Sequence, residues 1–331
     1  MSVAYIMDKG ARISKKGNQF IVIKDESIVS RIPVEILEGL VVVNSVQISS
    51  QAIVTLLQQN IPVSWISATG KYYGCLESPD HVNVEKHLQQ MTMRDDEFSL
   101  KMAKRVILAK VHNQVTLLQR YNRRINSEKM GQQVQTILSL AKHIEIVNTR
   151  EEIMGYEGII AKNYFEALGA MVFPPFSFEK RSKRPPLDPF NALLSLGYTL
   201  VFREIYTAVI SAGLHPYFGF LHSLKNHHPA LVSDLQEEWR TAIVDSLVVS
   251  LIHRKGIRIE HFQTEEGERG VFLTHEGWKI FLQAYENRMR THNAYVDGNC
   301  SYRQTLRNQA WDYSRALMAK NADLYHTLWI R

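Results

Sequence analysis

Residues 214–240 read LHPYFGFLHSLKNHHPALVSDLQEEWR, and the rest of the chain is best interpreted outward from this stretch. An aromatic turn ends in His222 and is followed by a polar loop and then by a helical pattern. Ser233 opens an S-x-x-Q capping box, which predicts that the helix begins at Asp234. Asp234 and Glu237 then lie at positions i and i+3, on neighbouring parts of one helix surface.

Two interpretations of these acidic residues are open. Carboxylates in the first turn of a helix complement the helix dipole, which contributes about 0.3–1 kcal/mol for each. Alternatively, carboxylate oxygens and one imidazole form a site for a hard divalent cation. The helical stripe through Glu237 continues to Val244, Val248 and Leu251, so this carboxylate is expected to point toward the packed side of the helix.

A second helix strengthens the cation interpretation. The run TREE, which begins at Thr149, is another capping box, and an amphipathic pattern follows it. The apolar stripe of this helix is formed by Ile153, Ile160, Tyr164 and Leu168. Glu157 falls in the middle of the stripe. Because an unpaired carboxylate in an apolar setting is costly, Glu157 is expected to be protonated, paired with Arg or Lys, or bound to a metal.

Four phrases in this part of the chain carry a family resemblance. They are YEGIIAKNYFEAL, RPPLDPFNALLSLGYTLV, GLHPYFGFLH and DLQEEWR, in that order. Two N-terminal phrases, GARISKKGNQFIV and VQISSQAIVTLLQQNIPVSW, extend the resemblance over nearly the whole chain. Together they resemble the Cas-one family, the metal-dependent DNA endonuclease/integrases of CRISPR adaptation.

The resemblance implies a set of site residues. In that family a Glu, a His and an acidic residue from three motifs bind a divalent metal, here Mg²⁺ or Mn²⁺. These positions match Glu157, His222 and Glu237, with Asp234 as the neighbouring catalytic acid. Many relatives carry Asp where this chain has Glu237, which leaves open whether Asp234 or Glu237 contacts the metal. His227 and His228 lie in the adjoining loop.

The resemblance also implies an activity and partners. A DNA 3′-hydroxyl would attack a phosphodiester and insert a foreign fragment into the CRISPR array, whereas attack by water would cleave DNA. The implied partners are double-stranded DNA with 3′ ends, CRISPR repeat DNA, a second copy of the chain in a homodimer, and the small Cas-two protein. A non-catalytic DNA-binding scaffold with a structural metal or a buried ion pair is the alternative.

Fold class and domains follow from the order of the patterns. The sequence predicts an α+β protein with a β-rich domain over residues 1–78 and an α-helical catalytic domain over residues 79–331. The resemblance assigns dimerisation to the first domain. Strands are expected over Ser2–Met7, Gln19–Lys24, Ile28–Ile32, Leu40–Val43 and Pro62–Ile66, with a helix at SSQAIVTLLQQN.

Later segments read as helices. Asp188 and Pro189 are expected to start one helix, and Thr274 is expected to start another. Residues Tyr302–Met318 are expected to form the last helix. In this last helix Leu306, Trp311 and Leu317 are candidate core residues. Its basic residues are expected on the outside: Arg303, Arg307 and Arg315.

Basic residues gather in two places. The helix over residues 101–124 carries seven basic residues and no acid, and such a single-sign stripe suits either a DNA backbone or a solvated face. The proline-rich segment over residues 173–189 is either a mobile loop or a clamp on DNA, and its Phe176 and Phe178 are expected to pack or to stack on bases. Candidate DNA contacts are Lys104, Arg105, Lys180, Arg181, Lys183, Arg184 and Lys225.

Bulk properties agree with a globular protein. The chain has 331 residues and a net charge of +6, which permits nucleic-acid binding without requiring it. Its two cysteines, Cys75 and Cys300, lie far apart in the sequence and neither belongs to a CxxC motif. A disulfide framework is therefore not expected, and we expect a cytoplasmic location. We find no apolar run of the ~20 residues that a membrane span needs and no signal-peptide pattern.

Overall fold

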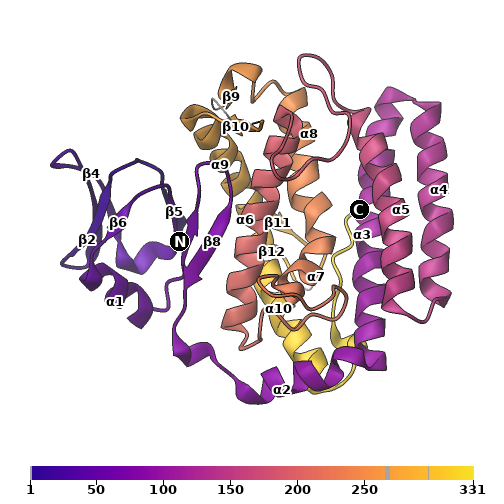
Figure 1. Cartoon of the computed structure of the whole chain (residues 1–331), viewed down its shortest axis with the longest axis horizontal. Helices are drawn as coiled ribbons and strands as arrows, with labels where there is room; N and C mark the ends of the chain where they lie inside the picture. The colour runs from indigo at the N-terminus through magenta and orange to yellow at the C-terminus, as the bar shows by residue number, and fades with distance from the viewer. Residues whose placement is uncertain (1, 265–268, 297) are drawn as a thin grey trace. The chain divides into compact units, whose positions relative to one another are not determined.

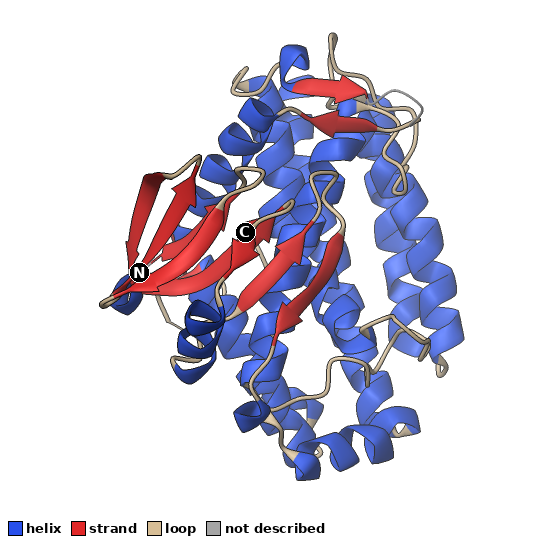
Figure 2. Ribbon diagram, turned by 60° about the vertical axis from the view of Figure 1, so that its left-hand side comes forward, coloured by secondary structure: helices blue, strands red, loops and turns tan. Residues whose placement is uncertain are grey.

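The computed structural model describes residues 2–264, 269–296 and 298–331. Contacts divide the chain into two units, Met1–His81 and Val82–Arg331, whereas the sequence predicted a boundary after residue 78. Strands gather in the first unit and helices in the second, which confirms the predicted α+β class (Figure 2).

The first unit contains two four-stranded sheets. One has the order β1-β5-β7-β8, with β5 parallel to both β1 and β7. Its strands are β1 (Ser2–Ile6), β5 (Leu37–Val43), β7 (Val63–Ile66) and β8 (Tyr72–Leu76). Residues Leu40–Val43 of β5 form a continuous buried run, as expected for the central strand of a parallel arrangement.

The other sheet has the order β4-β3-β2-β6. Its strands are β2 (Arg12–Lys16), β3 (Gln19–Lys24), β4 (Ser27–Pro33) and β6 (Gln47–Ile48), and the unit also contains helix α1 (Ser50–Gln58) and 3₁₀ turns η1 (Val34–Ile36) and η2 (Pro79–His81). The core combines both sheets with α1, because Ile13, Val42 and Leu56 are all buried in one cluster.

The second unit is mainly helical (Figure 1). Its helices are α2 (Val84–Thr92), α3 (Glu97–Ile125), α4 (Glu128–Ile146), α5 (Arg150–Gly169), α6 (Pro189–Ser211), α7 (Ala230–Trp239), α8 (Ser246–His253), α9 (His275–Arg290) and α10 (Tyr302–Met318). Short 3₁₀ turns are η3 (Met93–Asp95), η5 (Ile259–His261) and η6 (Ala322–Leu324), and a π-helical segment, η4 (Arg240–Asp245), joins α7 to α8. Two small ribbons pair β9 (Phe262–Thr264) with β10 (Val271–Leu273) and β11 (His292–Asn293) with β12 (Cys300–Ser301).

Several predicted helix starts are confirmed. Helix α5 begins with the capping box of Thr149, and its predicted apolar stripe is fully buried. Asp188 caps α6 with Pro189 in the first turn, and Thr274 caps α9. Side-chain capping therefore sets these ends as the sequence indicates.

The predicted start of α7 is wrong. The helix begins at Ala230, after Pro229, and not at Asp234. Proline has no N–H to leave unsatisfied, so it suits the start of a helix. Ser233 consequently lies inside the helix, and Asp234 is free to bond to the preceding loop instead of capping its own helix.

The predicted faces of α10 are partly wrong. Leu306 and Leu317 are buried as expected, but Trp311 is 46% exposed and Arg303 is buried. Arg303 lies on the buried stripe because it meets two acids there, donating to Glu204 at 3.0 Å and to Glu286 at 2.7 Å. Ion pairing across helices reverses the face that polarity alone predicts.

The long apolar helix α6 lies in the helical core. Among the described helices it is the one whose length and composition would allow it to cross a membrane, although the sequence indicated no such run. Of its apolar window, 67% is buried against the rest of the protein, as is typical of a core helix.

Candidate active site

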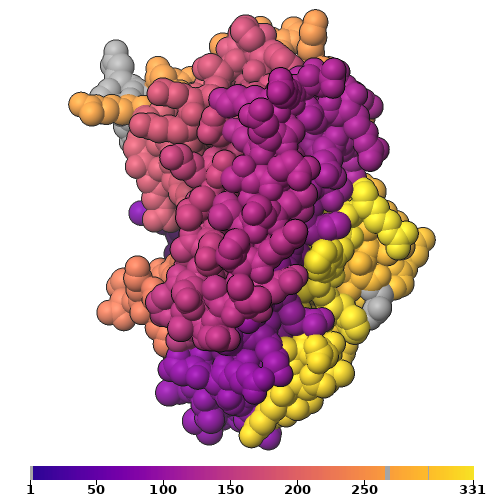
Figure 3. Space-filling view, turned by 90° about the vertical axis from the view of Figure 1, so that its right-hand side faces the viewer, coloured from indigo at the N-terminus to yellow at the C-terminus, as the bar shows by residue number. Residues whose placement is uncertain are grey.

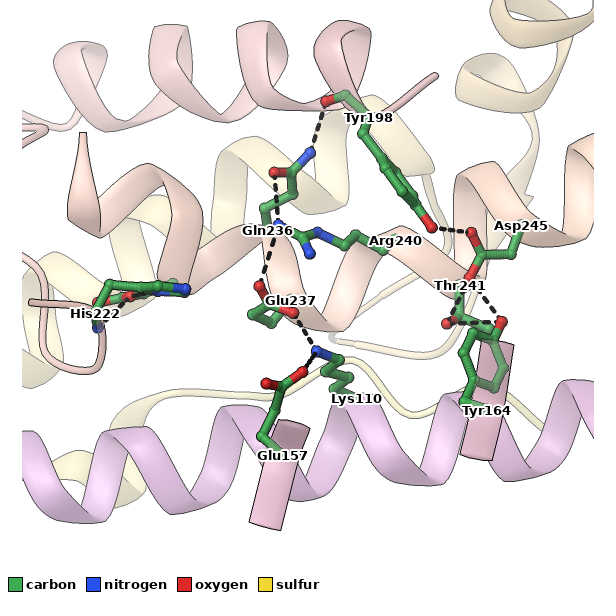
Figure 4. A network of polar contacts seen from close by, with 11 residues as sticks. Lys110, Glu157, Tyr164, Tyr198, His222, Gln236, Glu237, Arg240, Thr241 and Asp245 are labelled. Carbon is green, nitrogen blue, oxygen red and sulfur yellow. Dashed lines mark hydrogen bonds and ion pairs between the residues drawn. The ribbon is translucent and has the colours of Figure 1, made fainter. Parts of the chain in front are cut away.

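Two glutamates from separate helices converge on one cation. Lys110 of α3 donates through Nζ to Glu157 of α5 and, at 2.6 Å, to Oε2 of Glu237 of α7. Figure 4 shows the Lys110 ammonium between the two carboxylates. The other oxygen of Glu237 pairs with Arg240 at 3.1 Å. Thus Glu157, which the sequence placed in an apolar stripe, is paired with a basic residue, one of the three outcomes expected for such a position.

Burial and charge oppose each other in this cluster. Burial raises the pKa of Glu237, but the charges of Arg240 and Lys110 outweigh it and lower the pKa to about 2. Burial lowers the pKa of Lys110, yet Glu237 and Glu157 more than compensate and raise it. Glu237 and Lys110 are therefore both ionised at neutral pH.

The carboxylate of Asp234 organises the turn that carries His222. Its Oδ2 accepts the N–H groups of Phe220 at 2.6 Å and Leu221 at 2.9 Å. Its Oδ1 accepts the backbone N–H of His222 at 3.0 Å and lies 2.5 Å from ring Nδ1. Because a carboxylate can only accept, Nδ1 carries a proton, and Nε2 of His222 carries the lone pair when the ring is neutral.

Gly219 makes this close approach possible. A Cβ at this position would press on the Asp234 carboxylate and lie 2.7 Å from the backbone carbon of Ala230. Sequence reasoning missed both Gly219 and Lys110. The available signal for Lys110 was a basic residue on the apolar face of the helix over residues 101–124.

The π-helical segment η4 directly follows Glu237 and its helix. Tyr198 donates to Asp245 at 2.5 Å, and Tyr164 donates to the other oxygen at 2.6 Å. Burial raises the pKa of Asp245, and it accepts these hydroxyls inside the core. The guanidinium of Arg240 lies over the Tyr198 ring at 5.4 Å from its centroid, which fixes the cation beside Glu237. Tyr198 thus orients Arg240.

The basic residues of α3 do not form one DNA-facing stripe. Lys110 is buried, Lys104 donates to the carbonyl of Glu145 at 2.9 Å, and Arg105 pairs with Asp323. Arg105 also donates to the carbonyl of Tyr325, so it anchors the C-terminal segment. Figure 3 shows this segment in yellow at the surface beside the purple residues of the unit. DNA contact by Lys104 and Arg105 stays a prediction, and for Lys110 the stripe interpretation is wrong.

The basic residues of the loop between α5 and α6 differ in their exposure to solvent. Lys180, Lys183 and Arg184 are exposed, whereas Arg181 is half-buried and donates to Asn191 at 2.7 Å. Loss of hydration, followed by the charges of Arg240 and Arg181, lowers the pKa of Lys183. The charges of Glu237, Lys110 and Arg240 therefore also influence the pKa of Lys183.

The aromatic residues of this loop and the histidines near His222 make contacts with other rings. Phe176 is buried against Phe262 and Phe178 packs edge-on against Phe190, so packing and not base stacking is their role. The His228 ring meets the His222 ring at 5.7 Å between centroids. Lys225 is exposed in the same loop, and its backbone forms an isolated antiparallel β-bridge with that of His228. His227 adopts a positive φ.

The three predicted ligands are only partly assembled. Over residues 2–264, 269–296 and 298–331, no three His, Cys, Asp or Glu side chains form a group arranged to hold a metal ion. Glu157 and Glu237 meet through Lys110 (Figure 4). His222 is turned toward Asp234 instead. His222 and Glu237 are nevertheless close enough for the charge of each to influence the other's pKa.

Comparison with known proteins places this chain in a family. The sequence profile described as "CRISPR associated protein Cas1" matches residues 4–287. The chain is 32% identical over 297 residues to the CRISPR-associated endonuclease Cas1 of Mycobacterium tuberculosis, covering 89% of this chain and 87% of that protein.

Solved structures share the fold. A CAS1 protein from Thermotoga maritima superimposes with a TM-score of 0.83 at 23% identity, covering 96% of this chain and 97% of that one. A chain of a Cas6-RT-Cas1–Cas2 complex gives a TM-score of 0.86 at 25% identity, covering 99% of this chain and 36% of that one. Sequence match and fold agree over nearly the whole length, and the chain therefore belongs to the CRISPR-associated Cas1 family of endonuclease/integrases.

Proposed function

We propose that this protein is a metal-dependent DNA endonuclease/integrase that inserts foreign DNA fragments into the CRISPR array. The observation that carries this proposal is the convergence of Glu157 and Glu237 on one cation, next to the Asp234-held ring of His222. These residues come from three distant segments of the chain, and their convergence is a feature that a catalytic site needs.

The donor chemistry fits Mg²⁺ or Mn²⁺. Glu157 and Glu237 supply hard carboxylate oxygens, and His222 supplies Nε2. We assign Asp234 to positioning His222, because four donors already fill its acceptor sites and the residue is fully buried. A carboxylate that holds the far nitrogen of a ligating imidazole is a common partner of metal sites.

Each side chain then has a role in phosphodiester chemistry. The divalent ion, when bound, would supply Lewis-acid polarisation of a phosphate oxygen. Asp234 keeps the proton on Nδ1 of His222. Arg240 and Lys183 supply positive charge for the phosphate that enters beside the acid pair.

Two nucleophiles give two outcomes. A DNA 3′-hydroxyl forms a new phosphorus–oxygen bond while the bond from phosphorus to the target strand's 3′-oxygen breaks, which is strand transfer. Water in the same place yields cleavage. In both reactions the nucleophile loses a proton and the leaving oxygen gains one.

We further propose how DNA and protein partners engage. Lys180, Lys183, Arg184 and Lys225 are exposed in segments that adjoin the site and suit contact with phosphates. DNA with 3′ ends and CRISPR repeat DNA are the proposed substrates, and the β-rich unit is the proposed homodimer surface. One structure with the same fold is a chain of a Cas6-RT-Cas1–Cas2 complex, which supports a Cas2 protein as partner.

Strand transfer tests the proposal. Purified protein is incubated with a duplex bearing free 3′ ends, a CRISPR repeat target, and Mg²⁺ or Mn²⁺, and products are resolved on a denaturing gel. Glu157→Gln and His222→Ala are each expected to abolish transfer while DNA binding persists. Glu166→Gln is the matched control, because Glu166 lies on the same helix but pairs at the surface with Lys129. Transfer by Glu157→Gln at the wild-type rate would remove Glu157 from the site.

A second candidate is a DNA-binding scaffold without catalysis. The Lys110 bridge favours it, since Lys110 and Arg240 together balance the charges of Glu157 and Glu237 without a metal. Chelation with EDTA separates the two candidates. It abolishes product formation if the protein is a metal-dependent integrase, whereas a scaffold shows DNA binding with no product under either condition.

A further inference from the structure

Lys110 is buried, whereas the other basic residues of α3 are exposed or half-buried. Its side chain is 6% exposed, and its ammonium donates to one carboxylate from α5 and one from α7. The residue comes from a third helix, α3, so a single ammonium links three helices at the site. Lys101, in contrast, pairs with Glu97 at the helix surface.

The ammonium compensates a charge that is otherwise uncompensated. Glu237 also pairs with Arg240, but among the described residues the ion-pair partner of Glu157 is Lys110. Without Lys110, two carboxylates would face each other in a region that excludes most water. Like charges at this separation repel strongly, so one of them would be forced apart or protonated.

The ammonium and a divalent ion would compete for the same pair of carboxylates. Oε1 of Glu157 and Oε2 of Glu237 accept from the ammonium, and these are oxygens that a divalent ion would draw on. A divalent ion beside the ammonium would also be repelled by it. Lysine is suited to give way, because its charge sits at the end of a flexible four-carbon stem.

We propose that Lys110 is a positioning residue of the metal site, whose ammonium holds Glu157 and Glu237 together in the metal-free protein and is displaced when the divalent ion binds. This inference rests on the proposed function, in which these two glutamates are ligands. It makes metal binding a competition between two cations for one pair of carboxylates.

Calorimetric titration with Mn²⁺ tests this on the full chain. Lys110→Met removes the competing charge and keeps most of the apolar stem, so Mn²⁺ is expected to bind on the order of 10- to 100-fold more tightly than to the wild type. Without metal the same variant is expected to melt at a lower temperature, and Mn²⁺ should raise its melting temperature by more than it raises that of the wild type.

A matched control separates this effect from simple loss of a positive charge. Lys129→Met removes a lysine that pairs with Glu166 of α5, the helix that carries Glu157, but its side chain is 71% exposed. Its Mn²⁺ affinity is expected to equal that of the wild type. Lys110→Gln, which is also neutral, replaces Lys110→Met if the methionine variant does not fold.

The outcomes are distinguishable. Unchanged or weaker Mn²⁺ binding by Lys110→Met, with a wild type that binds Mn²⁺, overturns the displacement and makes Lys110 a permanent part of the site. Glu157→Gln tests the ligand set separately: wild-type affinity in that variant overturns the proposed metal site. Absence of binding in both the wild type and the neutral Lys110 variant overturns both proposals.

Discussion

Replacing Asp234 by asparagine tests the most constrained contact of the site. The Asp234 carboxylate accepts two backbone N–H groups through Oδ2 and two donors from His222 through Oδ1. An asparagine keeps one acceptor oxygen and presents an NH₂ group in place of the other. Whichever way the amide faces, two buried donors lose their acceptor.

The magnitude follows from those two donors. Hydrogen bonds to a charged group contribute about 1.5–3 kcal/mol each, so Asp234→Asn is expected to lower the free energy of unfolding by about 3–6 kcal/mol. Urea denaturation followed by tryptophan fluorescence measures this. Asp323→Asn is the control, because Asp323 forms an ion pair with Arg105 while 80% exposed, and its loss is expected to cost less than about 1 kcal/mol.

A second readout separates positioning from direct ligation. The amide no longer holds the His222 ring as a charged acceptor, so Mn²⁺ binding is expected to weaken on the order of 10- to 100-fold. A loss of stability below about 1 kcal/mol would refute the reasoning from buried donors. Full stability together with complete loss of Mn²⁺ binding would instead make Asp234 a direct ligand.

Two further predictions concern packing and pH. Gly219→Ala is expected to lower the free energy of unfolding by about 1–3 kcal/mol, since the new Cβ would press on Asp234. Gly155→Ala, whose Cβ would meet open space on α5, should be neutral or stabilising in the same urea titration, and equal effects of the two would contradict this view. Burial raises the pKa of Glu204, but the charges of Arg203 and Arg303 outweigh burial and lower the pKa from 4.5 to about 2. The ionised carboxylate of Glu204 therefore contributes its full stabilisation above pH 4.5, and this contribution is lost as the pH falls through 2. Glu204→Gln should therefore be about 3 kcal/mol less stable than the wild type at neutral pH, with the difference shrinking as urea titrations are repeated toward pH 3; a difference independent of pH would contradict the ion pairing.

The sequence by itself determined those features that local chemistry controls. Thr149, Asp188 and Thr274 set the starts of their helices through side-chain caps, which need only neighbours along the chain. The order of strands before helices predicted the α+β class. The position of Glu157 in an apolar stripe predicted that it would be protonated, ion-paired or bound to a metal, because burial of a lone carboxylate is costly.

Only the tertiary structure identified the basic partner of Glu157. Lys110 and Arg303 read as surface residues, yet each is buried where it meets two acids from other helices. Asp234 read as a helix-capping acid, but it holds the His222 turn. The stability of a buried charge depends on groups that other helices bring into contact with it. Helical periodicity predicts the direction in which a side chain points, but it does not identify the residues of other helices that the side chain meets.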